Sequence, residues 1–530
     1  MKSSNGSDTI HDKVINYLSK GHSMGPLSRP IFGRGRMRKS FEPQMTFGQV
    51  DISKITFDLR SRDEIPKLLM GLQYVYCTPE VRKQIFELLE KELIPEGTDA
   101  NKGRPGMTLW KILVLGTLRL NCNWDFDKVK DMADNHVRLR MMLGHGDFDD
   151  GEYPLQTIKD NVSLLSEELL KKVNEIVVKC GHELVIKKND DGVLRGRCDS
   201  YVVETDVHYP TDINLLWDAI RKVIVLVARL CVAVGVSEWR QSGYAMRKVK
   251  KLYRRAQRLK RSKSKDERKK EQKEGQIRDA HREYVDGVEG YVERAKETMG
   301  WLVGEGLVKA ADICEIENYI MHAERQIDQI RRRVIGGETI GHEEKVFSIF
   351  EPHTEWISKG KAGVPQELGL KVCILEDQYG FILHHMVMQK KGDEEVAVLM
   401  VEEAKGKYAE LRSCSFDKGF YTPMNRKSLE ELLEEVVLPK KGRLSAEERE
   451  REGAEDFVEQ RRKHSAVESG INALENHGVD RCPDHGIEGF RRYVALGVLG
   501  RNLQKLGDII QQRRLEAERR SGTNKYRKAS

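Results

Sequence analysis

Apolar residues at helical spacing dominate the chain, and two regions of β-type alternation interrupt them. From residue 64 to about residue 146, apolar positions recur every three or four residues and predict a domain of four or five helices. A further helix is predicted over residues 155–180. Alternating, β-branched residues from Val193 to Pro210 then predict a strand, and another helical block of roughly 130 residues follows it.

The second β region begins near Leu370. Two alternating runs, LKVCILED and FILHHMVMQ, flank Gln378, Tyr379 and Gly380, which predict a hairpin. A helix, a strand, a helix, a short strand and a long helix over residues 456–475 complete the order. When the helical block is set aside, this order predicts an α/β fold with a mixed sheet, into which the block is a long insertion.

Composition is typical of a soluble globular protein. The 530 residues are enough for about three or four folding units, and 33% of them are charged, with a mean hydropathy of −0.58. The nine cysteines form no CxxC pair, which argues against a disulfide framework or a thiolate zinc site and indicates a reducing compartment. The most apolar stretch, Val223–Val236, contains Arg229 and is too short to cross a bilayer. We therefore expect a cytoplasmic protein without a membrane partner.

The net charge of +7 is concentrated in one segment. Residues 240–274 hold 16 basic and 4 acidic residues, so the rest of the chain is net negative. These charges are predicted to fall on all sides of a helix, where at least one face must meet solvent or phosphate. In a protein that handles DNA, such a helix contacts backbone phosphates without reading bases. A solvated helical arm is the alternative.

Three acidic residues stand at informative places: Asp199 in the first predicted strand, Asp417 at the end of the fourth, and Glu468 on the last helix. In a mixed sheet the first and fourth strands can be adjacent, and a helix crossing them can bring the third carboxylate to their ends. Mg²⁺ binds oxygen ligands and retains waters, so this trio suits two magnesium ions, with Mn²⁺ as a substitute.

Each of these residues has a simpler interpretation. Asp417 fits a local turn at a strand end, and Ser465 and Glu468 have the spacing of a helix capping box. Asp206 is the rival for the first carboxylate, but strand alternation places it on the face opposite Asp199. The accessory candidates at the rim of the site are Glu204, His208, Asp212, His353 and Glu355.

Four motifs in order, CDSYVVETDVHYPTD, EPHTEWISKGKAGVPQELG, SFDKGFYTP and RRKHSAVESGINALENHG, resemble a DDE transposase of a bacterial insertion sequence. The resemblance extends from about Glu64 to Gly507. It implies an RNase H-like catalytic core with Asp199, Asp417 and Glu468 as the metal-binding catalytic triad. It also implies an all-α N-terminal domain that binds the terminal inverted repeats of the element.

The resemblance and the pattern together predict six segments. They are a flexible basic arm (1–62), a helical N-terminal DNA-binding domain (63–150), a linker helix with the first core strand (151–211), a helical insertion with the basic run (212–340), the remainder of the catalytic core (341–510) and a basic tail (511–530).

Duplex DNA is the expected partner, both as element ends and as target. Asp125 is expected to cap the second helix of a helix-turn-helix, although a helical hairpin that only packs on itself remains the alternative. The N-terminal arm with Arg34, Arg36, Arg38 and Lys39 is a candidate for the minor groove. The other predicted DNA-binding residues are Lys128, Lys130, Arg138, Arg140, Arg247, Lys248, Lys250, Lys251, Arg254, Arg255, Arg258, Arg461, Arg462 and Lys463.

Two positions depart from the family pattern. His464 and Glu475 stand where many relatives carry an arginine and a lysine, while Arg461, Arg462 and Lys463 lie nearby. The long insertion after the first strand is interpreted as a feature of a subgroup.

The activity that the resemblance implies is metal-dependent cleavage of a DNA strand, after which the freed 3′-OH attacks target DNA. A homodimer or larger synaptic assembly is expected to carry it out. The expected location is the cytoplasm, at the bacterial or archaeal nucleoid. Two alternatives stay open: an RNase H-like nuclease without strand transfer, and a domesticated DNA-binding protein that no longer cuts. The spacings at His342 and at Cys482 and His485 lack the partners that zinc sites require.

Overall fold

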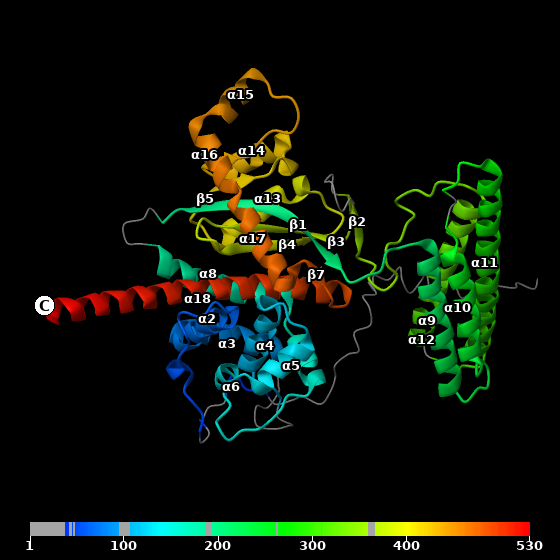
Figure 1. Cartoon of the computed structure of the whole chain (residues 1–530), viewed down its shortest axis with the longest axis horizontal. Helices are drawn as coiled ribbons and strands as arrows, with labels where there is room; N and C mark the ends of the chain where they lie inside the picture. Colours follow the sequence, from blue (N-terminus) through cyan, green and yellow to red (C-terminus); the bar gives the residue numbers. More distant parts are fainter. Residues whose placement is uncertain are drawn as a thin grey trace, which may run out of the picture.

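The chain folds into three parts, which Figure 1 shows: a central sheet with its covering helices, a group of N-terminal helices, and a separate helical bundle. The computed structural model describes residues 38–41, 45, 48–94, 106–186, 192–260, 263–308, 310–358 and 366–529. Most of the expected N-terminal arm, with Arg34 and Arg36, lies outside these residues. The protein is a mixed α/β protein that is mostly helical, with one mixed sheet of seven strands among the described residues.

The sheet is built around β1, the strand predicted first. The strands are β1 (Leu194–Thr205), β2 (Glu355–Ser358), β3 (Gln366–Glu376), β4 (Ile382–Met388), β5 (Leu411–Phe416), β6 (Glu435–Val437) and β7 (Arg481–Cys482). Their order is β2-β3-β1-β5-β6, with β4 also paired to β3 and β7 to β1. β1 is antiparallel to β3 and parallel to β5. The prediction that the first and fourth core strands are adjacent is therefore confirmed, as is the hairpin, in which Gly380 adopts a φ of 81°.

Helices cover both faces of the sheet. One face packs on α13 (Asp393–Lys407) and α14 (Pro423–Leu432). The other packs on α8 (Glu167–Val185), α17 (Ala466–Leu474) and the long α18 (Gly486–Ala529). Tyr201 and Val203 point to this second face. Asp199, two residues before Tyr201, shares it by strand alternation.

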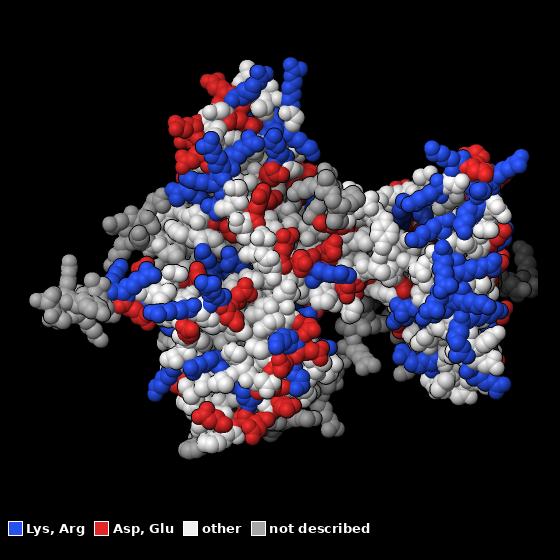
Figure 2. Space-filling view, viewed as in Figure 1, with Lys and Arg blue, Asp and Glu red and all other residues white. Residues whose placement is uncertain are grey.

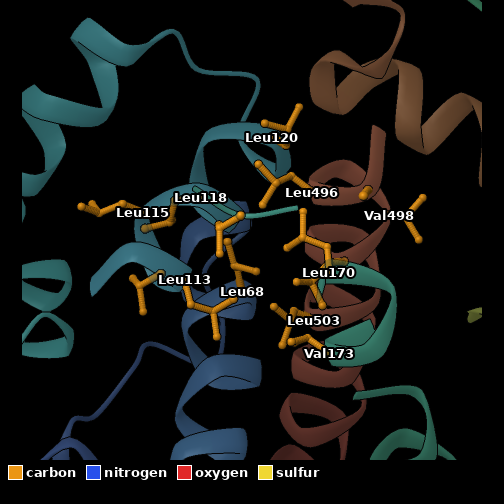
Figure 3. Close-up of a cluster of buried hydrophobic side chains, with 14 of the residues drawn as sticks. Leu68, Leu113, Leu115, Leu118, Leu120, Leu170, Val173, Leu496, Val498 and Leu503 are labelled. Carbon is orange, nitrogen blue, oxygen red and sulfur yellow. The ribbon is translucent and has the colours of Figure 1, made fainter. Parts of the chain in front are cut away.

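The N-terminal helices share the core of the second face. They are α2 (Glu64–Cys77), α3 (Pro79–Leu93), α4 (Leu109–Asn121), α5 (Phe126–Asn135) and α6 (Val137–Met142), followed by α7 (Leu155–Val162) and preceded by the short η1 (Ile52–Lys54). Figure 3 shows Leu68 of α2 and Leu118 of α4 in one cluster with Leu170 of α8 and Leu496 of α18. Apolar burial thus joins these helices to the sheet as one unit.

Close backbone contact fixes the crossing of α2 and α18. A Cβ added at Gly71 would overlap the carbonyl of Leu503, and one added at Gly507 would overlap the carbonyl of Lys67. Only glycine lets two helix backbones approach this closely. Asp125 caps α5 as predicted, because its Oδ1 accepts a hydrogen bond from Lys128 N at 2.7 Å.

The insertion forms a bundle of α9 (Asp212–Ala233), α10 (Ser242–Arg258), α11 (Glu267–Gly304) and α12 (Ala310–Ile330), closed by the π-turn η2 (Arg331–Ile335). It has a hydrophobic core of its own, to which no described residue of the sheet or of the N-terminal helices belongs. Figure 1 shows the bundle standing apart from the sheet, joined by the segments that leave β1 and enter β2.

Three predictions of local structure need correction. The long helix expected over residues 456–475 is divided at Ser465 into α16 (Glu455–His464) and α17, is preceded by the unpredicted α15 (Ala446–Gly453), and ends in the π-turn η4 (Glu475–Val479). The charges of α10 do not surround it, because Ala245, Val249 and Ala256 are buried against the bundle. The helix expected over residues 155–180 is two helices, α7 and α8, separated at residues 163–166. The basic tail continues α18 as a helix up to Ala529.

Candidate active site

The strand register brings Asp199 and Asp417 to the same level of the sheet. β1 and β5 are parallel, and Cys198 of β1 is paired with Phe416, the last residue of β5. Asp199 and Asp417 each follow one of these paired residues. Asp417 precedes the short 3₁₀-helix η3 (Lys418–Phe420). Because neighbouring strands are about 4.8 Å apart, these two residues lie side by side, where β5 ends beside the middle of β1.

Glu468 reaches the same place from a helix. It lies in the first turn of α17, which packs against β1. The negative charges of Asp417 and Glu468 both act on the Asp199 carboxylate and raise its pKa. The three acidic residues predicted from sequence are therefore in electrostatic contact, although they are 218 and 51 residues apart in the chain.

The three carboxylates differ in exposure. Asp199 is half-buried, whereas Asp417 and Glu468 are exposed. The pKa of Asp199 is raised to about 6, chiefly by burial and further by the charges of Asp417, Asp393 and Glu468, against the lowering effect of a 2.7 Å hydrogen bond from Ser200 N. A cation placed among these groups would relieve the repulsion, so the residues present fit a divalent metal. In the described part of the chain, no three His, Cys, Asp or Glu side chains are already gathered as metal ligands.

The simpler interpretations of Asp417 and Glu468 do not match the contacts. The side chain of Asp417 makes no capping hydrogen bond to η3. Ser465 Oγ donates to the carbonyl of Arg462 at 2.8 Å and does not cap α17, so Ser465 and Glu468 form no capping box. Both carboxylates remain available to a ligand.

The rival residue Asp206 is occupied elsewhere. Its Oδ1 accepts a hydrogen bond from Arg481 at 2.6 Å on the exposed surface past the end of β1. It is not among the main causes of the raised pKa of Asp199. The geometry thus favours Asp199 as the first carboxylate.

Sequence reasoning missed a fourth carboxylate, Asp393, in the first turn of α13. Its Oδ1 accepts a hydrogen bond from Ser200 Oγ at 2.7 Å, and its Oδ2 pairs with Lys371 Nζ at 2.9 Å. Asp393 thereby ties α13 to β1 beside Asp199 and to β3. In the sequence it looks like an acidic helix start, and only the strand register reveals its neighbours.

The accessory candidates do not join the carboxylates. His208 pairs with Asp218 at 2.5 Å. Asp212 pairs with Arg333 at 2.8 Å. On β2, Glu355 accepts a hydrogen bond from Lys390 N at 2.6 Å. Just before β2, His353 lies 3.7 Å from Glu351. Glu204 is partly buried near the end of β1. His485, which sequence spacing paired with Cys482, also contacts Glu351, at 2.7 Å.

The cations of the candidate recognition helix are largely paired. Lys128 bonds Asp131 at 2.8 Å, and Lys130 bonds Asp134 at 2.6 Å. Arg140 of α6 donates to main-chain carbonyls, including that of Asp134 at 3.0 Å, and Arg138 is exposed with only a sulfur contact to Met141. Within the ranges that the structure describes, Arg138 alone of these four predicted DNA-reading residues carries a charge without an oxygen partner.

The basic face of α10 is different. All seven of its predicted DNA-binding residues lie at least partly at the surface, and Figure 2 shows Lys and Arg covering much of the bundle surface in view. Arg255 pairs with Glu283, and Lys250 lies 5.9 Å from the ring centroid of Trp217. No carboxylate in the described ranges pairs with the other five, which are Arg247, Lys248, Lys251, Arg254 and Arg258.

A second group of cations ends α16. Arg461, Arg462 and Lys463 are exposed and precede Glu468 by five to seven residues. Lys463 pairs with Glu459 at 2.7 Å. Figure 2 shows blue side chains gathered over the part of the molecule where α14 and α16 lie, above the sheet.

No protein-family model, curated protein or solved structure matches the chain. Among the described residues, no helix is long and apolar enough to cross a membrane.

Proposed function

We propose that the protein is a DDE transposase, a metal-dependent polynucleotidyl transferase. The observation that carries the proposal is the convergence of Asp199, Asp417 and Glu468 where β5 ends beside the middle of the parallel strand β1. The strand order β4-β3-β1-β5-β6, with the first three strands antiparallel and the last two parallel to β1, supports an RNase H-like core.

Asp199, Asp417 and Glu468 would hold the metal ions. When bound, two Mg²⁺ ions, or Mn²⁺ in their place, stabilise charge on the attacking and leaving oxygens at phosphorus. Asp199 holds a negative charge at a half-buried position, where it acts more strongly than in water. Asp417 and Glu468 leave the site open to a phosphodiester because both are exposed. No Ser or Tyr nucleophile is needed.

Duplex DNA is the proposed partner. The five cations of α10 that no described carboxylate neutralises and the basic end of α16 supply phosphate contacts, and the N-terminal helices are the proposed readers of the element ends. Since two ends react together, we expect a homodimer or larger assembly, acting in the cytoplasm at the nucleoid.

The test is a cleavage and strand-transfer assay on linear DNA that ends in the repeats flanking the coding sequence. Wild type with Mg²⁺ is expected to cut and to join, and Asp417→Asn to lose both activities by at least about 100-fold, by loss of a metal ligand. Asp206→Asn is the matched control, since it removes a nearby carboxylate outside the cluster, and it should retain activity. Loss in Asp206→Asn with retention in Asp199→Asn would move the first ligand to Asp206.

One observation favours a second function. The basic face of α10 belongs to a bundle with its own core, so it can bind duplex DNA whether or not the carboxylates hold a metal. A DNA-binding protein that no longer cuts is therefore the second candidate. Salt-sensitive DNA binding without cleavage by wild type would select that function. Cutting without joining would select the nuclease.

A further inference from the structure

Glu468 differs from the other two acidic residues because the sheet does not hold it. Asp199 and Asp417 are fixed by the strand register. Glu468 is carried by α17, a short helix that begins directly after the break at Ser465. Its distance from the other carboxylates therefore depends on what holds α17 against the sheet.

One contact holds the chain before Glu468. His464, the last residue of α16, places Nδ1 2.9 Å from Ser415 Oγ. Ser415 is buried and lies on β5, two residues before Asp417. Burial lowers the pKa of His464, and the nearby charges of Asp417 and Glu468 oppose this effect while Arg197 reinforces it. The hydrogen bond ties the start of α17 to the strand that carries Asp417.

A second contact holds the helix after Glu468. A Cβ added at Gly470 would overlap Glu376 Oε2. Glu376 is 4% exposed, ends β3, and lies 3.6 Å from Arg197 Nη1. Arg197 is paired with Glu376 across the strands and precedes Asp199 by two residues on β1. α17 therefore rests on the buried Glu376, whose neighbour Arg197 is on the strand that carries Asp199.

We infer that His464 and Gly470 are positioning residues that set the distance of Glu468 from Asp199 and Asp417. The hydrogen bond to Ser415 holds α17 on one side of Glu468, and on the other side the missing side chain of Gly470 lets α17 lie directly on Glu376. Each contact fixes the position of α17 relative to a strand that carries one of the other two carboxylates. The consequence for catalysis rests on the proposed function, whereas the contacts themselves do not.

The first test separates the two nitrogens of His464. An asparagine amide reaches the place of Nδ1 and can keep the bond to Ser415, whereas a glutamine amide reaches the place of Nε2. His464→Asn is expected to cut and join DNA at close to the wild-type rate, and His464→Gln to lose about 10- to 100-fold, as for outer-shell partners of metal ligands. The reverse order, with Gln active and Asn inactive, would overturn the positioning role.

The second test needs no activity. Urea midpoints are measured without metal for His464→Ala, Ser415→Ala and the double variant. If the two side chains act through one hydrogen bond, the double variant unfolds at nearly the same midpoint as the less stable single variant. Additive shifts would overturn the contact. This result is informative even if wild type proves unable to cut DNA, so failure of the inference and failure of the proposed function are distinguishable.

The third test uses a matched pair of helical glycines. Gly470→Ala places a methyl group where the Glu376 carboxylate lies, so that α17 or this carboxylate must shift. If α17 shifts, the rate of cutting falls by about 10- to 100-fold and a higher Mg²⁺ concentration is needed for the half-maximal rate. Gly300→Ala in α11 meets no atom within 4 Å and should leave the rate unchanged. In Gly470→Ala, Glu376→Asp shortens the obstructing side chain and should restore part of the rate. Wild-type behaviour of Gly470→Ala would refute the role of this contact.

Discussion

The N-terminal helices and the bundle are both all-helical regions of similar apolar spacing, yet they relate to the sheet in opposite ways. Helices α2 to α5 share one continuous core with α8, α18 and one face of the sheet. Helices α9 to α12 have a separate core. The first group is therefore expected to move and unfold with the carboxylate site, and the second to behave as an attached arm.

Two polar contacts join the N-terminal helices to the segment between α17, which carries Glu468, and α18. Arg119 of α4 forms two hydrogen bonds to Asp484, at 2.7 and 3.0 Å, just before α18. His477, in the turn that ends α17, lies 3.2 Å from Glu64 of α2. A protein that recognises DNA with these helices would hold that DNA in a fixed relation to the site.

The largest expected effect comes from breaking the joint at Arg119. Its side chain is 4% exposed and that of Asp484 12%. Asp484→Asn leaves the buried guanidinium without its counter-charge and should cost about 3–5 kcal/mol of unfolding free energy. Glu238→Gln, which breaks the half-exposed pair of Glu238 with Arg294 in the bundle, is the control and should cost about 0–1 kcal/mol.

Urea unfolding followed by far-UV circular dichroism checks this prediction. If the two regions are independent, Asp484→Asn shifts one of two transitions to lower urea and leaves the other in place. A single transition that moves as a whole in both variants would show that the bundle and the sheet unfold together, and would remove the distinction between the regions.

The second largest expected effect is a pH-dependent change in the stability of the sheet that the bundle does not share. The pKa of Asp199 is raised from 3.8 to about 6 in the folded protein, so its ionised form destabilises the fold. The shift corresponds to about 3 kcal/mol. In metal-free buffer at pH 8, Asp199→Asn should therefore raise the stability of the sheet by up to about that amount. The gain should shrink as the pH falls through 6, vanish below 3.8 and leave the bundle transition unchanged.

Thermal melts of wild type and Asp199→Asn at pH 4 and pH 8 measure this difference. Added Mg²⁺ should stabilise wild type more than the variant, because the metal neutralises the charge that the variant lacks. A stability gain that is equal at both pH values would contradict the raised pKa.

The strands β1, β3, β4, β5 and β6 were predicted in their chain order, because alternation and turn residues are local signals, whereas the short strands β2 and β7 were missed. The catalytic role of the three acidic residues stays a prediction. The sequence did not predict the break at Ser465, since the apolar spacing of residues 456–475 runs through it. The buried side of α10 was missed because its residues there, such as Ala245 and Ala256, are small and lie within a run of charges. The position of Asp393 beside Asp199 depends on contacts between distant segments. The close crossing of α2 and α18 likewise depends on two glycines far apart in the chain, so neither feature could be predicted from a single segment.

The smallest expected effect per residue concerns DNA binding, and it tests which region supplies the phosphate contacts. Arg247, Lys251, Arg254 and Arg258 recur at helical spacing on one face of α10 and have no acidic partner within the described residues. Changing Arg247, Lys251 and Arg254 to Gln should reduce the slope of log binding constant against log salt by up to about 0.9 for each phosphate that the helix no longer neutralises. Lys128→Gln with Lys130→Gln in α5 is the matched control, since Asp131 and Asp134 already neutralise these lysines.

Fluorescence anisotropy on duplexes of unrelated sequence should show the reduced slope for the α10 variant alone. A larger change of slope in the α5 variant would assign the backbone contacts to the rigidly joined helices and make the bundle a solvated arm.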